Sequence, residues 1–228
     1  MNLALVAIVL AIGGGAVLAV STRNDAASAI GIAITLVGSA LLSDPLPSAA
    51  VLGVRVVAAL LVATMIRSAM RTGPRQPSPA GWPSEALLAT AGAVAGLGLA
   101  VGLASVAAAG GLPVGLPGVG EPSPGGAVGA GGGTVTSMAL ITAAGASLLV
   151  LGAAPLVHGR PGPRRAIGLV LVTQAVLLLR IGVAGPAVEL EEIAREGLLV
   201  VAGATGAALA IAAASSIPGR DDAEPAGT

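Results

Sequence analysis

The side chains best able to do chemistry in this sequence are a few charged and amide groups inside or beside long apolar runs. Arg55 stands about seven residues into an apolar run that begins near residue 49, and Gln174 stands in the middle of another run. Placing such a group in a membrane is costly, so it indicates an ion path or a contact between helices. We therefore take Arg55 and Gln174 as candidates for an ion path or for helix packing.

A second set of charged side chains is suited to ion pairs at a membrane interface. Arg55 could extend to that interface or pair with Asp44 instead of serving an ion path. Arg180, near the end of its run, is expected to pair with an acidic residue of the run that follows. The interfacial candidates are Asp44, Arg180, Glu189, Glu191 and Glu192.

The acidic run itself predicts a short amphipathic helix before the last apolar segment. It spans residues 189–196, and within it Glu191 and Arg195 are spaced i,i+4, as are Glu192 and Glu196. We expect these carboxylates to be solvated at a helix start, where the helix dipole favours acidic groups. Acid/base catalysis by the paired carboxylates is the less favoured interpretation.

Several kinds of chemistry are excluded by composition. The chain has no Cys and one His, His158, so thiolate catalysis, clusters and multi-histidine metal sites are excluded. Gly131-Gly132-Gly133-Thr134 has no Lys and indicates a linker, not a phosphate loop. No hydrolase constellation is present, the net charge is +0, and we expect no catalytic residue, metal, cofactor or nucleic-acid partner.

The elements that carry these residues are predicted to be transmembrane helices. Of the 228 residues, 55% are hydrophobic and 10% are charged, and the apolar residues form blocks near the ~20 residues that cross a bilayer. The expected fold is all-α, an integral membrane helical bundle of about seven transmembrane helices, with lipid contacts. The predicted spans are 3–21, 26–42, 49–66, 86–109, 135–157, 166–183 and 197–215.

The arginines support this count and orient the chain. Eight of the eleven basic residues fall in alternate loops or the tail: Arg23, Arg67, Arg71, Arg75, Arg160, Arg164, Arg165 and Arg220. The opposite side carries only Arg195. By the positive-inside rule the N-terminus is outside and the C-terminus inside. We expect a multi-pass protein of a bacterial or archaeal cytoplasmic membrane.

An internal repeat is also indicated. Ala29-Ile30-Gly31 and Ala166-Ile167-Gly168 each follow a basic loop and open an apolar helix. The expected organisation is two parallel three-helix repeats plus one linking helix. The units are residues 1–71; residues 72–134, with a linker, the fourth helix and a Gly/Pro-rich external loop; residues 135–217; and a disordered tail, 218–228.

The three-helix unit resembles a known family of small membrane subunits. Ser43-Asp44-Pro45-Leu46-Pro47-Ser48-Ala49 is similar to the Asp-Pro-Leu-Pro pattern of C-type subunits of Mrp cation/proton antiporters. Arg165-Ala166-Ile167-Gly168-Leu169, followed by Gln174-Ala175-Val176, resembles a second helix of the same subunits. The family includes the K-type subunit of respiratory complex I and the E-type subunit of group 4 membrane-bound hydrogenases.

The resemblance implies a membrane-arm subunit that supports proton or cation translocation and packs against large antiporter-like subunits. Membrane glutamates of K-type subunits would fall near Val170 and Thr205, so both of those carboxylates are missing here. No carboxylate lies inside any predicted span, so we expect no proton relay by the chain alone. The alternatives are a non-catalytic membrane scaffold of another system and a small secondary transporter.

Overall fold

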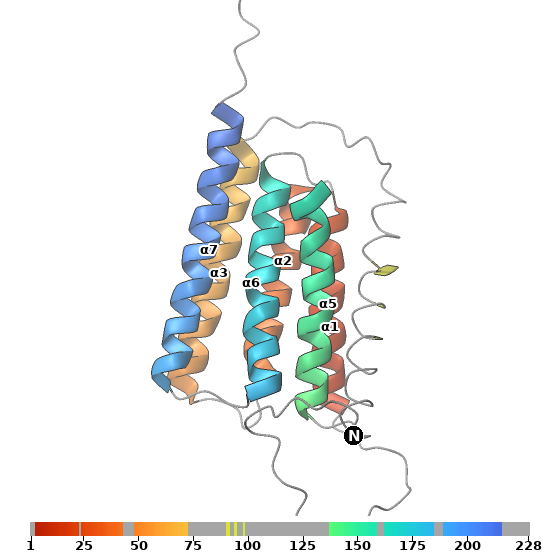
Figure 1. Ribbon diagram of the computed structural model, residues 1–228. Coiled ribbons are helices and arrows are strands. Elements are labelled where there is room, and N and C mark those ends of the chain that lie inside the picture. The colour runs from red at the N-terminus through yellow and green to blue at the C-terminus, as the bar shows by residue number, and fades with distance from the viewer. Residues whose placement is uncertain are drawn as a thin grey trace, which may run out of the picture.

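Among the residues that the structure describes, all regular secondary structure is helical. The computed structural model describes residues 3–22, 24–42, 48–72, 90–91, 94, 98, 137–158, 162–184 and 189–215. Its helices are α1 (Leu3–Ser21), α2 (Asp25–Leu41), α3 (Ala49–Thr72), α5 (Ser137–His158), α6 (Pro163–Ala184) and α7 (Glu189–Ser215) (Figure 1).

These helices have the length and composition of a helical membrane bundle. Five of them are long and apolar enough to cross a bilayer, and α2 is an apolar helix of 17 residues. The expected all-α membrane fold is therefore confirmed at this level, whereas the count of seven stays a prediction. Of the predicted fourth span, residues 90–91, 94 and 98 are helical, and the rest of 86–109 lies outside the described residues. So do the Gly/Pro-rich loop and the tail.

The helices form two sets of three that run in the same directions. The colours of Figure 1 show α1 and α3 running opposite to α2, and α5 and α7 running opposite to α6, with α1, α3, α5 and α7 parallel. Within each set a helix packs against its neighbour in sequence, and the sets meet where α1 contacts α5 and α3 contacts α7. Helices α2 and α6 lie in the middle of the bundle and also touch.

Glycines allow the first two helices of each set to approach closely. A Cβ placed on Gly31 would lie 2.6 Å from the Gly15 carbonyl oxygen, and one on Gly168 would lie 2.8 Å from that of Gly152. Lipid tails give helices no hydrophobic reason to associate, so close van der Waals contact between small residues carries this packing. The two Ala-Ile-Gly motifs thus make the same kind of contact in the two sets.

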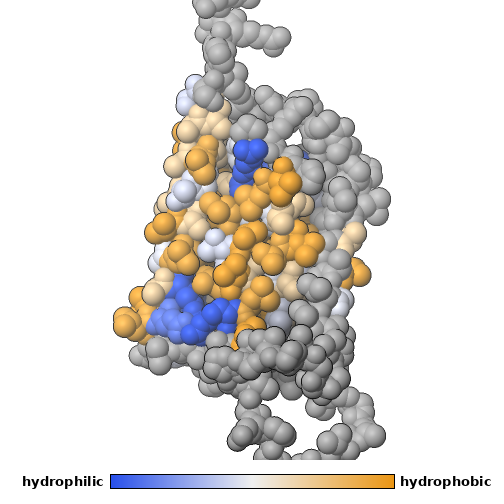
Figure 2. Space-filling model, viewed as in Figure 1, coloured by the Kyte–Doolittle hydropathy of each residue, from blue (hydrophilic) through white to orange (hydrophobic). Residues whose placement is uncertain are grey.

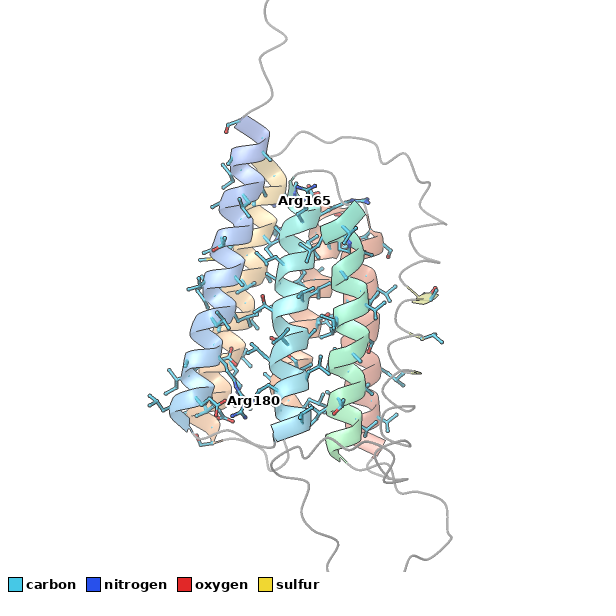
Figure 3. The ribbon with its side chains drawn as sticks, viewed as in Figure 1. Arg165 and Arg180 are labelled. Atoms are coloured by element: carbon cyan, nitrogen blue, oxygen red, sulfur yellow. The ribbon has the colours of Figure 1, made fainter. Side chains whose placement is uncertain are left out.

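The outer surface of the bundle suits a lipid environment. Figure 2 shows an apolar band between two hydrophilic zones, and Arg165 and Arg180 lie at opposite ends of α6 (Figure 3). Exposed hydroxyl groups on this surface bond to their own helices: those of Thr64, Ser68 and Thr205 donate to Leu61, Met65 and Val201 carbonyls at 2.7–2.8 Å. Such internal bonds satisfy polar groups where water is absent.

Candidate functional site

Arg55 lies at the centre of a charged cluster at the end of the bundle where α3 and α7 begin. It is the seventh residue of α3, and only 6% of it is exposed. Its Nη2 lies 2.8 Å from Glu192 Oε1, and its Nε lies 3.7 Å from Glu196 Oε1, both on α7. Its Nη1 donates to the Ala40 carbonyl of α2 at 3.2 Å. The guanidinium therefore joins three helices instead of extending outward.

The acidic run belongs to α7 itself, which corrects the sequence interpretation of a separate, solvated helix. Helix α7 is continuous from Glu189 to Ser215, and its candidate membrane span begins at Leu190. The side chains of Glu192 and Glu196 are only 15% and 19% exposed. A helix continues because these residues are good helix formers, and Arg55 supplies the charge that lets the carboxylates be buried. Carboxylates thus lie within a candidate span, contrary to expectation.

A second, more exposed group of charges adjoins the first. Arg195 Nη2 donates to Glu191 Oε1 at 2.8 Å, so the i,i+4 spacing forms an ion pair along α7. Arg180, at the end of α6, pairs with the same carboxylate oxygen. Arg180 and Glu191 are 38% and 34% exposed, whereas only 10% of the Arg195 side chain is. The hydrophilic zone in the lower part of Figure 2 lies at this end, where Figure 3 labels Arg180.

Gln174 lies deeper in the bundle and links α6 to α2. Its Nε2 donates to Ser39 Oγ at 2.7 Å, and Ser39 Oγ donates in turn to the Leu36 carbonyl at 2.7 Å. Only 8% of Gln174 and 7% of Ser39 are exposed. An amide buried between helices can be satisfied only by such a partner, so this bond fixes α6 against α2.

A small cavity connects the charged cluster with this amide. It has a volume of about 30 Å³, and its polar lining consists of Ser39, Arg55, Gln174, Arg195 and Glu196. This is room for about two or three water molecules, which need ~10–15 Å³ each. Arg195 Nη1 is buried and has no hydrogen-bond partner among the described residues. The arrangement can therefore hold water or a small polar species between a carboxylate and an amide, next to two guanidinium groups.

The structure thus brings together most of the candidates named from the sequence. Arg55, Gln174, Arg180, Glu191 and Glu192 lie at or beside this cluster. Asp44 lies outside the described residues, as does the side chain of Glu189, the first residue of α7. Among the described residues, no group of three or more His, Cys, Asp or Glu side chains could hold a metal ion.

Sequence reasoning missed the pairing of Arg55 with α7 and the participation of Ser39, Arg195 and Glu196. One signal could have found the pairing. Gly152 lies 137 residues after Gly15, Gly168 lies 137 after Gly31, and Glu192 lies 137 after Arg55. Extending the register of the Ala-Ile-Gly motifs without a gap therefore places Arg55 and Glu192 at equivalent positions of the two sets.

Comparisons with known proteins add no relative to this description. No protein-family model matches the chain, and neither the curated proteins nor the solved structures contain a match.

Proposed function

We propose that the chain is a membrane subunit of a complex that moves protons or other cations. The observation that carries this proposal is the buried cluster of Arg55, Glu192 and Glu196 beside a polar cavity. Burying a charge inside a membrane bundle costs free energy, so buried charges usually mark the path of an ion or a proton or another functional site. The resemblance to K-, C- and E-type small subunits names the class of complex and, as partners, its large antiporter-like subunits.

We also propose a complete membrane topology for the chain. The chain crosses a bacterial or archaeal cytoplasmic membrane seven times, N-terminus outside and C-terminus inside, with two parallel three-helix units and a linking fourth helix. The basic end of α6, with Arg164 and Arg165, faces the cytoplasm, and the Arg55 cluster faces outward. Supporting this are the matching helix directions of the two sets (Figure 1). Reporter domains fused at Gly125 and at the C-terminus should lie on opposite sides; finding both on one side excludes this topology.

A self-contained secondary transporter is the second candidate, and one observation favours it. Glu192 and Glu196 belong to a candidate span, and Glu196 lines the cavity next to Gln174. Transporters place ionisable groups between helices of repeated units, usually nearer the membrane midplane than Glu192 and Glu196 lie here. A subunit would move no ions without its partners, whereas a transporter would.

The experiment that separates these candidates uses the purified full-length chain and the chain in its native membrane. A subunit should co-purify with large antiporter-like proteins in mild detergent and should give no saturable proton or cation flux when reconstituted alone. Saturable flux from the chain alone would establish the transporter. If the chain shows neither flux nor antiporter-like partners, the remaining alternative is a non-catalytic membrane scaffold of another system.

A substitution at the cavity then tests whether the chain's own carboxylate contributes. Glu196→Gln keeps the shape but removes the charge, and in the assembled complex it should lower ion flux while co-purification is unchanged. Glu191→Gln is the matched control, because Glu191 lies in the more exposed group of charges. Flux equal to that of the parent in Glu196→Gln would exclude a role for Glu196 in translocation.

A further inference from the structure

The interface between α3 and α7 brings equivalent positions of the two sets face to face. Arg55 and Glu192 are 137 residues apart, as are Val62 and Leu199 further along the same helices. Val62 and Leu199 both belong to the buried core, 0% and 3% exposed. Because α3 and α7 are parallel and in contact, residues at the same level along the two helices meet. At the charged end, Arg55 thus meets its own counterpart Glu192, whereas Val62 packs against Gly203, one turn beyond its counterpart Leu199.

Beyond Arg55, Glu192 and Glu196 the interface includes apolar contacts, such as that of Val62 with Gly203, whereas the turn that carries Arg55 and Glu192 is charged. If the two sets carried the same residue at the level of Arg55, two guanidiniums or two carboxylates would meet in a buried site. Instead Arg55 meets Glu192, with the charged atoms 2.8 Å apart. The next turn repeats the asymmetry: Glu196 lies 137 residues after Ala59, which is buried and small. One set supplies a cation and space, and the other supplies two carboxylates.

We propose that the Arg55–Glu192 pair determines how the two sets of helices associate. It selects α3 of the first set, residues 3–72, as the partner of α7 of the second set, residues 137–215, and it fixes one register between these helices. A buried ion pair adds little net stability compared with a well-packed apolar pair. Its main effect is to destabilise alternative arrangements of the helices, because burying two like charges or an unpaired charge is strongly disfavoured. The pair therefore excludes self-association of either set through this face and register shifts along it.

Disulfide trapping in the full-length chain tests this directly, because the sequence contains no Cys. A Cβ placed on Gly203 lies 3.3 Å from Val62 Cβ, close to the ~3.5–4.5 Å range of disulfides. The variant Val62→Cys/Gly203→Cys should thus form an intramolecular disulfide in membranes under mild oxidation. Val62→Cys/Gly206→Cys is the control that should not, since a Cβ on Gly206 meets Ala166 of α6.

Charge reversals are then introduced into the cross-linking variant. Arg55→Glu or Glu192→Arg alone should lower the yield of the intramolecular disulfide about fivefold or more, because like charges meet in a buried site. The double reversal Arg55→Glu/Glu192→Arg should recover at least half of the original yield, since Arg at 192 can also pair with Glu196. Arg180→Glu, a reversal outside this interface, should leave the yield unchanged.

The amount of chain that accumulates in the membrane is measured with each cross-linking yield. If a single reversal prevents the chain from accumulating, we expect the double reversal to restore accumulation, and this recovery supports the proposal in the same way as recovered cross-linking. The proposal is wrong if both single reversals cross-link like the parent. It is also wrong if the double reversal accumulates and cross-links no better than the single ones.

Discussion

Two kinds of helix interface in this bundle contrast with each other: the contacts of α1 with α2 and of α5 with α6 inside the sets, and the contact of α3 with α7 between them. Inside each set, Gly15 meets Gly31 and Gly152 meets Gly168, so the two sets use the same small residues at equivalent positions. Between the sets, Arg55 meets Glu192, so equivalent positions carry opposite charges. Packing within a set needs only close approach, which glycine supplies on both helices. Packing between two similar surfaces needs a means of telling them apart.

The two interfaces should therefore respond to different substitutions. Shape should dominate within the sets, because backbone atoms lie directly against backbone atoms there. Charge should dominate between the sets, where side chains of Arg55, Glu192 and Glu196 fill the contact. Substitutions in each interface can therefore break one kind of packing while leaving the other intact.

The largest effect is expected when the glycine contact is filled. In Gly31→Val the new Cβ would lie 2.6 Å from both the Gly15 carbonyl oxygen and the Ala19 amide nitrogen, and backbone atoms cannot move aside. We expect a loss of about 3 kcal/mol or more in unfolding free energy, or no folded protein. Thermal unfolding of the purified chain in detergent measures this.

Gly14→Val is the matched control for this substitution. Gly14 is exposed, and a Cβ there meets nothing within 4 Å, so Gly14→Val should be neutral or slightly stabilising, because Val has a higher helix propensity than Gly. Gly168→Val should behave like Gly31→Val, because its Cβ would lie 2.8 Å from the Gly152 carbonyl oxygen. A stable Gly31→Val protein would show that the close approach of α1 and α2 is not required.

The next effect is expected at the charged interface. Arg55→Leu leaves Glu192 and Glu196 without their shared cation in a mostly buried site, which should cost about 3 kcal/mol of unfolding free energy. Adding Glu192→Leu should return part of that loss, because one of the two unpaired carboxylates is then gone. If Arg55→Leu is as stable as the parent, Arg55 does not hold α3 to α7.

The sequence predicts the helices well and the charged cluster poorly, for a physical reason. Hydropathy over ~20 residues marks a membrane helix, so α1 and α5 fall within two residues of the predicted spans 3–21 and 135–157. Helix α7 begins eight residues before the predicted span 197–215, because hydropathy alone ends a span at charged residues. Those charges are compensated by Arg55, a residue more than a hundred positions away.

Partners along one helix can be predicted from spacing, whereas partners on different helices cannot. The i,i+4 spacing identifies Glu191 and Arg195, which do form an ion pair at 2.8 Å. The partner of Gln174 is Ser39, 135 residues away, and nothing local to either residue points to the other. Only the 137-residue offset between the two Ala-Ile-Gly motifs relates such distant positions, and it aligns Arg55 with Glu192 but not Gln174 with Ser39.

A smaller effect is expected at the amide contact between α6 and α2. Gln174→Leu removes the 2.7 Å bond to Ser39, and bonds between membrane helices contribute ~0.6–2 kcal/mol, so we expect a loss of about 1 kcal/mol. Ser39→Ala should cost a similar amount. The double variant should cost less than the sum of the two, as a double-mutant cycle would show. Thr173→Val is the control, because among the described residues the Thr173 hydroxyl donates to the Leu169 carbonyl of its own helix and not to another helix.

The smallest effect is expected at Arg180. Comparing it with Arg55 shows whether an exposed ion pair stabilises the bundle as much as a buried one. Arg180 is 38% exposed, and its partner Glu191 is 34% exposed and also holds Arg195 at 2.8 Å. Exposed ion pairs contribute ~0–1 kcal/mol, so Arg180→Leu should lower the unfolding free energy by well under 1 kcal/mol. Glu191 keeps Arg195 after the substitution, whereas Arg55 is the only cation paired with Glu192 among the described residues. Thermal unfolding of the two variants side by side measures the contrast. Equal losses would mean that burial at the α3–α7 contact does not set the importance of its charges, and that any arginine at this end of the bundle stabilises it alike.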